Sequence, residues 1–439
     1  MFLVDPKSWP GAPSHLRHGL GRGRYHGTWV ADLGRLILLA AALGIAAAIG
    51  IIQVDRSDVF TYRDWGEAFV HGAVPYRDVE IEYPPGALAL FVAPVLVTST
   101  RLYVSVFLAM MLIATAFAMI AADRLALELR RHGDGVRLTW LVVTGLVVVL
   151  GSVALSRFDA VPAALTVVGL LMLVRDRHYL GGIALGAAIA IKLYPVVALP
   201  IAITYVVRRA GARAAATTAA LGLGVVAVAY APFLLLSAGG VQDSLSVQLV
   251  RSLEIESLGG ALFATAHRIF GTPLAEQPNY YDFAGGTANV VGLISTAIGL
   301  VCIVALWIGH LRARVGPASL VRYSAATIAA VIAFGKVLSP QYLLWLVALV
   351  PLVAGVRGRV ASGLLGIACL LTAVVFPSHW DVLLHQLDAM SLSLIVIRDF
   401  LLVGLVVALS WPAMTKYNGR RHAQHLDRVA PECVTADGT

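Results

Sequence analysis

Long runs of apolar residues, separated by short polar segments, occupy most of this chain. A helix needs about 20 residues to cross the hydrocarbon core of a bilayer, or fewer where protein surrounds it. Predicted membrane helices cover 35–54, 102–122, 138–155, 159–174, 215–237, 287–309, 318–335, 341–355, 360–376 and 392–414. The apolar segment 180–207 is interrupted by Lys192 and Pro195, which predicts a hairpin of two short helices. The pattern predicts about 12 crossings in total.

The composition supports this interpretation. Apolar residues make up 59% of the chain and charged residues 13%, against about 45–50% and 25% in soluble proteins. The mean hydropathy is +0.82. Three cysteines, two of them in apolar segments, build no disulfide framework. These values exclude a water-soluble enzyme, a secreted disulfide scaffold and a disordered chain, and they predict an all-α polytopic membrane protein.

The distribution of basic residues predicts the orientation. If the N-terminus is cytoplasmic, 22 of the 33 Lys and Arg residues fall on the cytoplasmic side and eight on the outer side. We therefore expect a cytoplasmic segment 1–34, a transmembrane domain 35–415 and a cytoplasmic tail 416–439 in the cell membrane. The net charge of +8 is explained by cytoplasmic turns, and no nucleic-acid partner is expected.

The predicted outer side carries the long polar loops. The first outer loop, 55–101, has seven acids within residues 55–82, although the whole chain has only 25. It contains a short predicted helix, 86–97, that lies on the membrane surface. The second long outer loop covers 238–286 and is rich in glycine. Long loops on one face, without two similar halves, are unlike a channel or an inverted-repeat carrier.

Short motifs in these loops carry a family resemblance. The first loop reads Asp58-Val-Phe-Thr-Tyr62, then Gly72-Ala-Val-Pro-Tyr76, then Glu82-Tyr83-Pro84-Pro85-Gly86. Later segments read Lys192-Leu-Tyr-Pro195 and Lys336-Val-Leu-Ser-Pro-Gln-Tyr342. In this order the motifs resemble glycosyltransferase family 87, which has the GT-C membrane fold and uses polyprenyl-phosphate sugars. The resemblance covers most of residues 35–415.

Two positions depart from the family pattern and bear on the donor sugar. Family members often have Gly-Gln-x-Asn where this chain has Ser156-Arg-Phe-Asp159. Several mannosyltransferases have histidine where this chain has Gln341 and Tyr342. The family includes actinobacterial mannosyltransferases and relatives that transfer arabinofuranose, so both sugars stay open.

The resemblance implies an inverting glycosyltransferase. It would move a sugar, with mannose favoured, from a polyprenyl-phosphate donor to a lipid-linked or polysaccharide acceptor of the cell envelope on the outer face. The alternatives are an arabinofuranosyltransferase that uses decaprenyl-phosphate arabinose, a transporter or flippase for a lipid-linked saccharide, and a non-catalytic assembly partner. Acids gathered on one side favour a transferase, because a carrier needs ionisable residues spread through the midplane.

Such a reaction needs one general base and cationic groups around the departing phosphate. Asp58 is the predicted base, because it closely follows the first predicted helix and matches the family position. The predicted phosphate-binding residues sit at outer helix ends: Arg157, Lys336, His379 and Arg398. Predicted sugar or acceptor contacts are Tyr62, Asp64, Tyr83, Arg251 and Glu256. Because cations can stabilise a single phosphate ester, no metal ion or cofactor is expected.

Structural interpretations exist beside these roles. Arg157 could pair with Asp159, and Arg398 with Asp399. Lys336 could extend to the membrane interface, and His379 could belong to an interfacial belt. The role of Lys192 stays open.

Overall fold

The computed structural model describes residues 57–97, 99, 102–131, 139–271 and 282–411, together with residues 41, 44, 45 and 48. The predicted first membrane helix, 35–54, lies largely outside the described residues. The predicted cytoplasmic segments 1–34 and 416–439 lie wholly outside them, as does Asp55, the first of the seven acids of the first outer loop.

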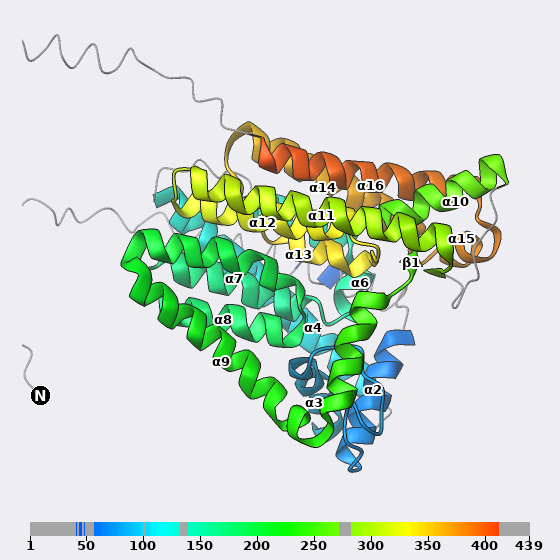
Figure 1. Cartoon of the computed structure of the whole chain (residues 1–439), viewed down its shortest axis with the longest axis horizontal. Helices are drawn as coiled ribbons and strands as arrows, with labels where there is room; N and C mark the ends of the chain where they lie inside the picture. The colour runs from blue at the N-terminus through cyan, green and yellow to red at the C-terminus, as the bar shows by residue number, and fades with distance from the viewer. Residues whose placement is uncertain are drawn as a thin grey trace, which may run out of the picture.

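The described chain is almost entirely helical (Figure 1). Six of its helices are long and apolar enough to cross a membrane, which makes this a multi-pass membrane protein. These are α4 (Tyr103–Arg131), α9 (Leu199–Val250), α11 (Gly286–Arg312), α12 (Pro317–Phe334), α14 (Gly355–Val375) and α16 (Ala389–Ser410). Shorter helices are α2 (Ser57–Val70), α3 (Leu88–Val97), α5 (Thr139–Val149), α6 (Gly151–Ser156), α7 (Ala160–Val174), α8 (His178–Ile191), α10 (Leu258–Phe270), α13 (Leu344–Val347) and α15 (Trp380–Gln386).

Short 3₁₀ turns and one small sheet complete the described part. The turns are η3 (Pro85–Ala87), η4 (Tyr194–Ala198), η5 (Pro340–Leu343) and η6 (Val350–Leu352). Strands β1 (Leu253–Glu254) and β2 (Asp282–Phe283) pair antiparallel, with Leu253 opposite Phe283. The predicted short helix 86–97 is confirmed by η3 and α3.

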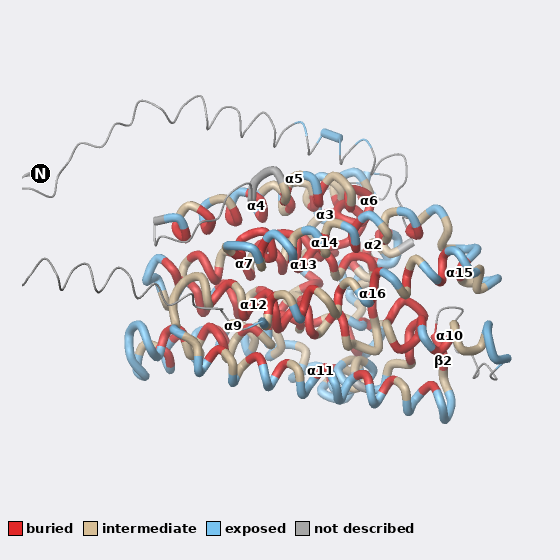
Figure 2. The backbone as a smooth tube through the Cα atoms, turned by 90° about the horizontal axis from the view of Figure 1, so that it is seen from above, coloured by how far each residue is buried: buried red, intermediate tan, exposed pale blue. Residues whose placement is uncertain are grey.

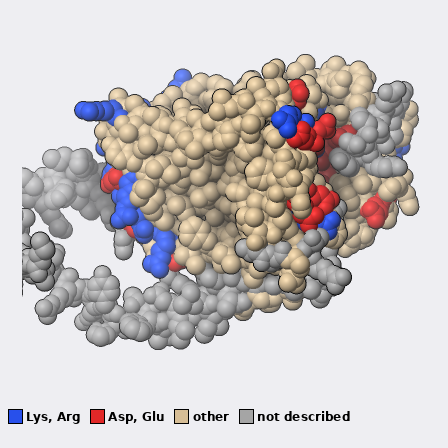
Figure 3. Space-filling model, turned by 90° about the horizontal axis from the view of Figure 1, so that it is seen from below, with Lys and Arg blue, Asp and Glu red and all other residues tan. Residues whose placement is uncertain are grey.

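The helices run roughly along the long axis, so their ends gather at two ends of the molecule (Figure 1). Figure 2 shows the buried residues concentrated in the middle of this bundle. On the face shown in Figure 3, Lys and Arg gather at one end and Asp and Glu toward the other. We call these the basic end and the acidic end. The separation agrees with the charge pattern along the sequence, and the number of 12 crossings stays a prediction.

The hairpin predicted around Lys192 is confirmed. Helix α8 ends at Ile191, Lys192 is extended (φ −153°, ψ 136°), and η4 leads into α9. Helix α9 is itself interrupted at Gly211 (φ 87°) and Ser237. Its first part therefore runs from the acidic end to the basic end, and its second part returns. The last part, 238–250, packs against the first loop, where Ser244 Oγ donates to the carbonyl of Ile81 at 2.6 Å.

Two predicted spans are broken helices. Segment 341–355 forms η5, α13 and η6, and Pro351, inside the segment, has no backbone N–H with which to continue a helix from α13. This irregular stretch is buried in protein, which is where a membrane protein tolerates non-helical backbone. Segment 138–155 is divided at Leu150 into α5 and α6.

Small residues allow α8 and α9 to pack closely. Gly182 and Gly186 on α8 face Thr218 and Gly222 on α9. A Cβ at Gly186 would lie only 2.2 Å from the carbonyl oxygen of Gly222. Close backbone approach through small residues four apart is a common device of membrane helix pairs. This contact fixes the orientation of α8, and with it the position of Lys192 at the acidic end.

We expect Gly186→Ala to destabilise the purified protein, because the new methyl group must separate α8 from α9. Overpacking of this kind costs about 1–3 kcal/mol, and thermal unfolding in detergent should occur at a lower temperature. The control is Gly224→Ala, on the exposed side of α9 with no atom within 4 Å of the added Cβ. Equal melting temperatures of the two variants would contradict the packing argument.

Candidate functional site

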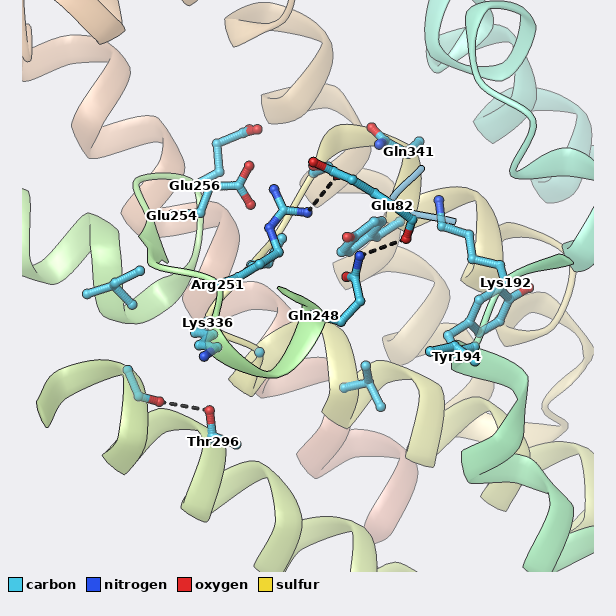
Figure 4. Close-up of a pocket in the computed structure, with 18 of the residues that line it drawn as sticks. Glu82, Lys192, Tyr194, Gln248, Arg251, Glu254, Glu256, Thr296, Lys336 and Gln341 are labelled. Carbon is cyan, nitrogen blue, oxygen red and sulfur yellow. Dashed lines mark hydrogen bonds and ion pairs between the residues drawn. The ribbon is translucent and has the colours of Figure 1, made fainter. Parts of the chain in front are cut away.

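A cavity of about 930 Å³ lies among the helix ends at the acidic end. The N-terminal ends of α2 and α11 meet there with the C-terminal ends of α6, α8 and α12. Irregular segments after Glu82, before β1 and after α12 complete the wall. Figure 4 shows Arg251 in the middle, with Glu254 and Glu256 on one side and Lys192 and Tyr194 on the other.

Asp58 lines this cavity and forms an ion pair with Arg157. The distance from Arg157 Nε to Asp58 Oδ2 is 2.8 Å. Asp58 stands in the first turn of α2, where a carboxylate is favoured by the helix dipole. Its side chain is partly exposed, whereas that of Arg157 is buried. The predicted base is therefore open to the cavity and held from behind by a guanidinium.

Asp159 forms a second ion pair, with Lys192. Lys192 Nζ lies 2.7 Å from Asp159 Oδ1, and the same oxygen accepts a 2.6 Å hydrogen bond from Trp345 Nε1. The alternative in which Arg157 pairs with Asp159 is not what the structure records. In the turn between α6 and α7, Arg157 instead contacts α2 through Asp58, and Asp159 contacts the α8 hairpin through Lys192.

Four aromatic rings surround the Lys192 ammonium. Its Nζ lies 4.8 Å from the ring centre of Phe158 and between 5.4 and 5.6 Å from the ring centres of Tyr83, Tyr342 and Trp345. Trp345 is stacked between Tyr194, at 3.9 Å, and Tyr342, at 4.2 Å. An ammonium is stabilised over aromatic faces, especially where water is excluded.

A second group of charges lies near α11. Arg251 Nη1 is 3.9 Å from Glu82 Oε2, and Gln248 Nε2 donates to the carbonyl of Glu82 at 2.9 Å. Lys336 lies beside Arg251, and burial together with this neighbouring charge lowers the pKa of Lys336. Two adjacent cations disfavour each other, so this part of the cavity is suited to an anion.

The segment that carries Arg251 is fixed to the rest of the protein by buried acids. Glu254 accepts a 2.8 Å hydrogen bond from the backbone N–H of Leu338, and its own N–H donates to the carbonyl of Lys336 at 2.9 Å. Glu256 accepts from Arg398 Nη1 at 2.9 Å. Burial, and then the neighbouring Glu256, raise the pKa of Glu254 to about 8. Burial therefore favours the neutral, protonated form of Glu254.

The cavity is open along one side. Three of its apolar lining residues, Val196 in η4, Val250 at the end of α9 and Leu293 in α11, are also 46%, 74% and 70% exposed at the surface. Neighbouring α11 residues such as Ile294 and Val301 are exposed as well. We call this opening, formed by Val196, Val250 and Leu293, the lateral mouth. In a membrane helix, exposed apolar side chains of this kind face lipid.

The structure brings several of the predicted site residues together. Asp58, Tyr83, Arg157, Arg251, Glu256 and Lys336 all line the cavity. It places the other four outside the lining. Tyr62 is buried and stacks on Phe91 at 4.5 Å, and Asp64 pairs at the surface with Arg63 at 2.7 Å.

The last two predicted phosphate ligands also lie elsewhere. Arg398 is buried in α16 between Glu256 and Asp399, with 2.9 Å to each carboxylate, so it reaches the cavity only through Glu256. His379 Nδ1 lies 2.9 Å from the carbonyl of Val374.

Sequence reasoning missed several lining residues, namely Gln248, Asn289 and Trp345, and quoted Glu82 only as part of a motif. Lys192 did carry a signal, because it is the single charge inside an apolar hairpin. Trp345 and Gln248 look like ordinary helix residues in the sequence, and only tertiary packing brings them here. Among the described residues, no three side chains of His, Cys, Asp or Glu are grouped closely enough to hold a metal ion.

The open cavity of this helical membrane protein contains a carboxylate, several cations and aromatic rings. Such a combination is typical of the active site of a membrane enzyme. Comparison with protein families identifies which kind. The model of glycosyltransferase family 87 matches residues 82–340. The chain therefore belongs to glycosyltransferase family 87 and is a membrane glycosyltransferase, as the sequence motifs predicted. Membership of this family carries with it the expectation of the GT-C fold.

Comparisons with individual proteins add less information about this chain. No curated protein matches the chain. Among solved structures, the chain is similar to ArnT from Cupriavidus metallidurans, determined bound to undecaprenyl phosphate. The two are 17% identical with a TM-score of 0.46, over 87% of this chain and 77% of ArnT.

The raised pKa of Glu254 predicts a pH-dependent stability. The carboxyl loses its proton near pH 4.5 when exposed and near pH 8 when folded, so the unfolded chain binds fewer protons between these values. Stability must then fall as pH rises toward 8 and level off above it. We expect the melting temperature to decline between pH 6 and pH 9, and Glu254→Gln to remove much of that decline. The exposed Glu80→Gln should keep the wild-type slope; if Glu254→Gln keeps it too, the assignment is wrong.

Proposed function

We propose that this glycosyltransferase uses a polyprenyl-phosphate sugar as donor, with mannose favoured, and transfers the sugar with inversion to a lipid-linked or polysaccharide acceptor of the cell envelope. The main support for the proposal is that the charged cavity opens at a lateral mouth, which is lined by lipid-facing residues. A donor with a long apolar tail and a phosphate head fits both parts at once. A nucleotide sugar would leave the apolar mouth without a ligand.

The phosphate is best accommodated by Lys336 and Arg251. The side-chain carbons of Lys336 pack near Gly292 on α11, one residue from Leu293 at the mouth. A lipid whose tail lies against α11 would therefore present its phosphate to these cations. Charge-assisted hydrogen bonds to phosphate oxygens are about twice as strong as neutral ones. This assignment keeps Lys336 as predicted and adds Arg251, which the sequence suggested for sugar contact.

Asp58 is proposed as the general base, and Arg157 as the residue that holds it. The acceptor hydroxyl gives its proton to Asp58 while its oxygen forms a bond with the anomeric carbon of the donor sugar. The bond from that carbon to the phosphate oxygen breaks, and its electron pair leaves with the polyprenyl phosphate. Lys336 and Arg251 then stabilise the charge that develops on this leaving group.

We also propose that the acidic end faces the outside of the cell. The turns of the basic end contain Arg175, Arg209, Arg213, Arg312 and Arg357. Cytoplasmic loops of membrane proteins are enriched in such residues. The reaction would then occur on the outer face, with both chain ends in the cytoplasm.

The first test is transfer by the purified protein. We expect wild-type protein to transfer labelled mannose from polyprenyl-phosphate mannose, and Asp58→Asn to lower kcat by roughly 10²–10⁴-fold. The matched control is Asp64→Asn, in the same helix but outside the cavity, which should stay near wild type. Melting temperatures show whether each variant is folded. Turnover by folded Asp58→Asn above about a tenth of wild type would remove the base assignment. Transfer of arabinofuranose alone from a matched donor would select the alternative sugar.

The orientation has its own test, in a variant without the native cysteines. An impermeant maleimide should label Asp243→Cys, exposed at the acidic end, in intact cells. It should label Ala212→Cys, exposed at the basic end, only after lysis, because the membrane blocks the reagent. The reverse pattern would place the site on the cytoplasmic face.

A further inference from the structure

One wall of the cavity has no part in the scheme above. Tyr83, Lys192, Tyr342 and Trp345 all line the cavity, and we call them the Lys192 wall. Lys192 is held by Asp159, which is itself fully buried and fixed by Trp345. A lysine in this position is expensive to bury, and its ion pair recovers that cost only when further polar contacts are made.

The Lys192 ammonium has donors left for a ligand. An ammonium carries three N–H groups. Among the described residues, the hydrogen bond recorded for Nζ goes to Asp159 Oδ1, and the surrounding rings offer only their faces. The remaining N–H groups can therefore donate to an oxygen that enters the cavity.

The charges around Lys192 indicate whether the ligand oxygen that it binds belongs to a hydroxyl or to a phosphate. Around Lys192, the four charges of Asp58, Arg157, Asp159 and Lys192 cancel, and Lys192 lies within electrostatic range of both Asp58 and Arg157. A phosphate placed here would meet two carboxylates. Near the lateral mouth, by contrast, Arg251 and Lys336 lie with Glu82 and with Glu254, and burial favours the neutral form of Glu254. The neutral region suits a hydroxyl, and the cationic region suits the phosphate.

We infer that the Lys192 wall is the subsite for the transferred sugar, in which Lys192 donates to a ring hydroxyl and Tyr342 packs against the sugar. The inference rests on the proposed function, and it assigns a binding position to the sugar part of the proposed donor. It agrees with the general form of small-molecule sites, in which aromatic surface supplies contact area and a few fixed polar groups supply orientation. The wall adjoins Asp58, so the sugar would lie beside the base, with its phosphate toward the mouth.

The test separates binding of sugar from binding of phosphate. The affinity of the purified full chain is measured for polyprenyl-phosphate mannose and for sugar-free polyprenyl phosphate. The main variant is the double change Lys192→Met/Asp159→Asn, because removing Lys192 alone would leave a buried carboxylate unpaired. We expect it to weaken binding of the sugar-bearing lipid roughly 10-fold or more, and to leave binding of the sugar-free lipid within about twofold.

Two further variants keep the result interpretable. Lys336→Ala is the matched control at the phosphate end and should weaken both lipids alike. Tyr342→Leu removes a ring without changing any charge, and should show the same selective loss as the double variant if that variant does not fold.

The inference is overturned if the Lys192 and Tyr342 variants weaken both lipids equally, which would make the wall part of the phosphate site. It is also overturned if they weaken neither, which would make the wall structural. Failure of the proposed function gives a different result, because the wild-type protein would then bind neither lipid.

Discussion

Two ion pairs, both anchored in the three-residue turn between α6 and α7, determine the arrangement of this protein's site. Arg157 holds Asp58 at the start of α2, and Asp159 holds Lys192 at the break after α8. Phe158, between them, is fully buried and contacts the rings of Tyr62, Tyr83 and Phe91. One turn thus connects the first loop, the α8 hairpin and the aromatic core, and a shift of the turn would move Asp58 and Lys192 together.

The low dielectric of a membrane protein explains why these charges are paired so strictly. An isolated buried charge is very unfavourable, so each cation near the cavity lies close to a carboxylate or to an opening. The same logic applies to Arg398 in α16, whose guanidinium contacts both Glu256 and Asp399. This contact ties the segment of Arg251 and Glu254 to a membrane helix, so a segment predicted as part of a long outer loop becomes a fixed wall of the site.

The cavity combines two environments that the proposed lipid-linked donor would need. Its interior has paired charges and stacked rings, where a polar head can be oriented. Its mouth is formed by apolar residues that are exposed beside α11, where a chain can remain in lipid. The broken helices lie around the cavity, because irregular backbone at membrane depth is tolerated where it lines a polar cavity. Pro195 and Pro340 mark two of these breaks.

The sequence by itself determined the helical membrane class, the hairpin at Lys192, the short helix after Pro85 and the family, because hydrophobic length and proline position act locally along the chain. It also singled out Asp58, Arg157, Lys336 and Arg251, since charges stand out in an apolar sequence. Only the tertiary structure decided the partners: Arg157 pairs with Asp58 and Asp159 with Lys192, although Arg157 and Asp159 are neighbours in the chain. Tyr62 and Arg398 turned out to lie behind the cavity rather than in it. The physical reason is that pairing and burial depend on which helix faces meet, and close contacts such as Gly186 against Gly222 set those faces between segments far apart in the sequence.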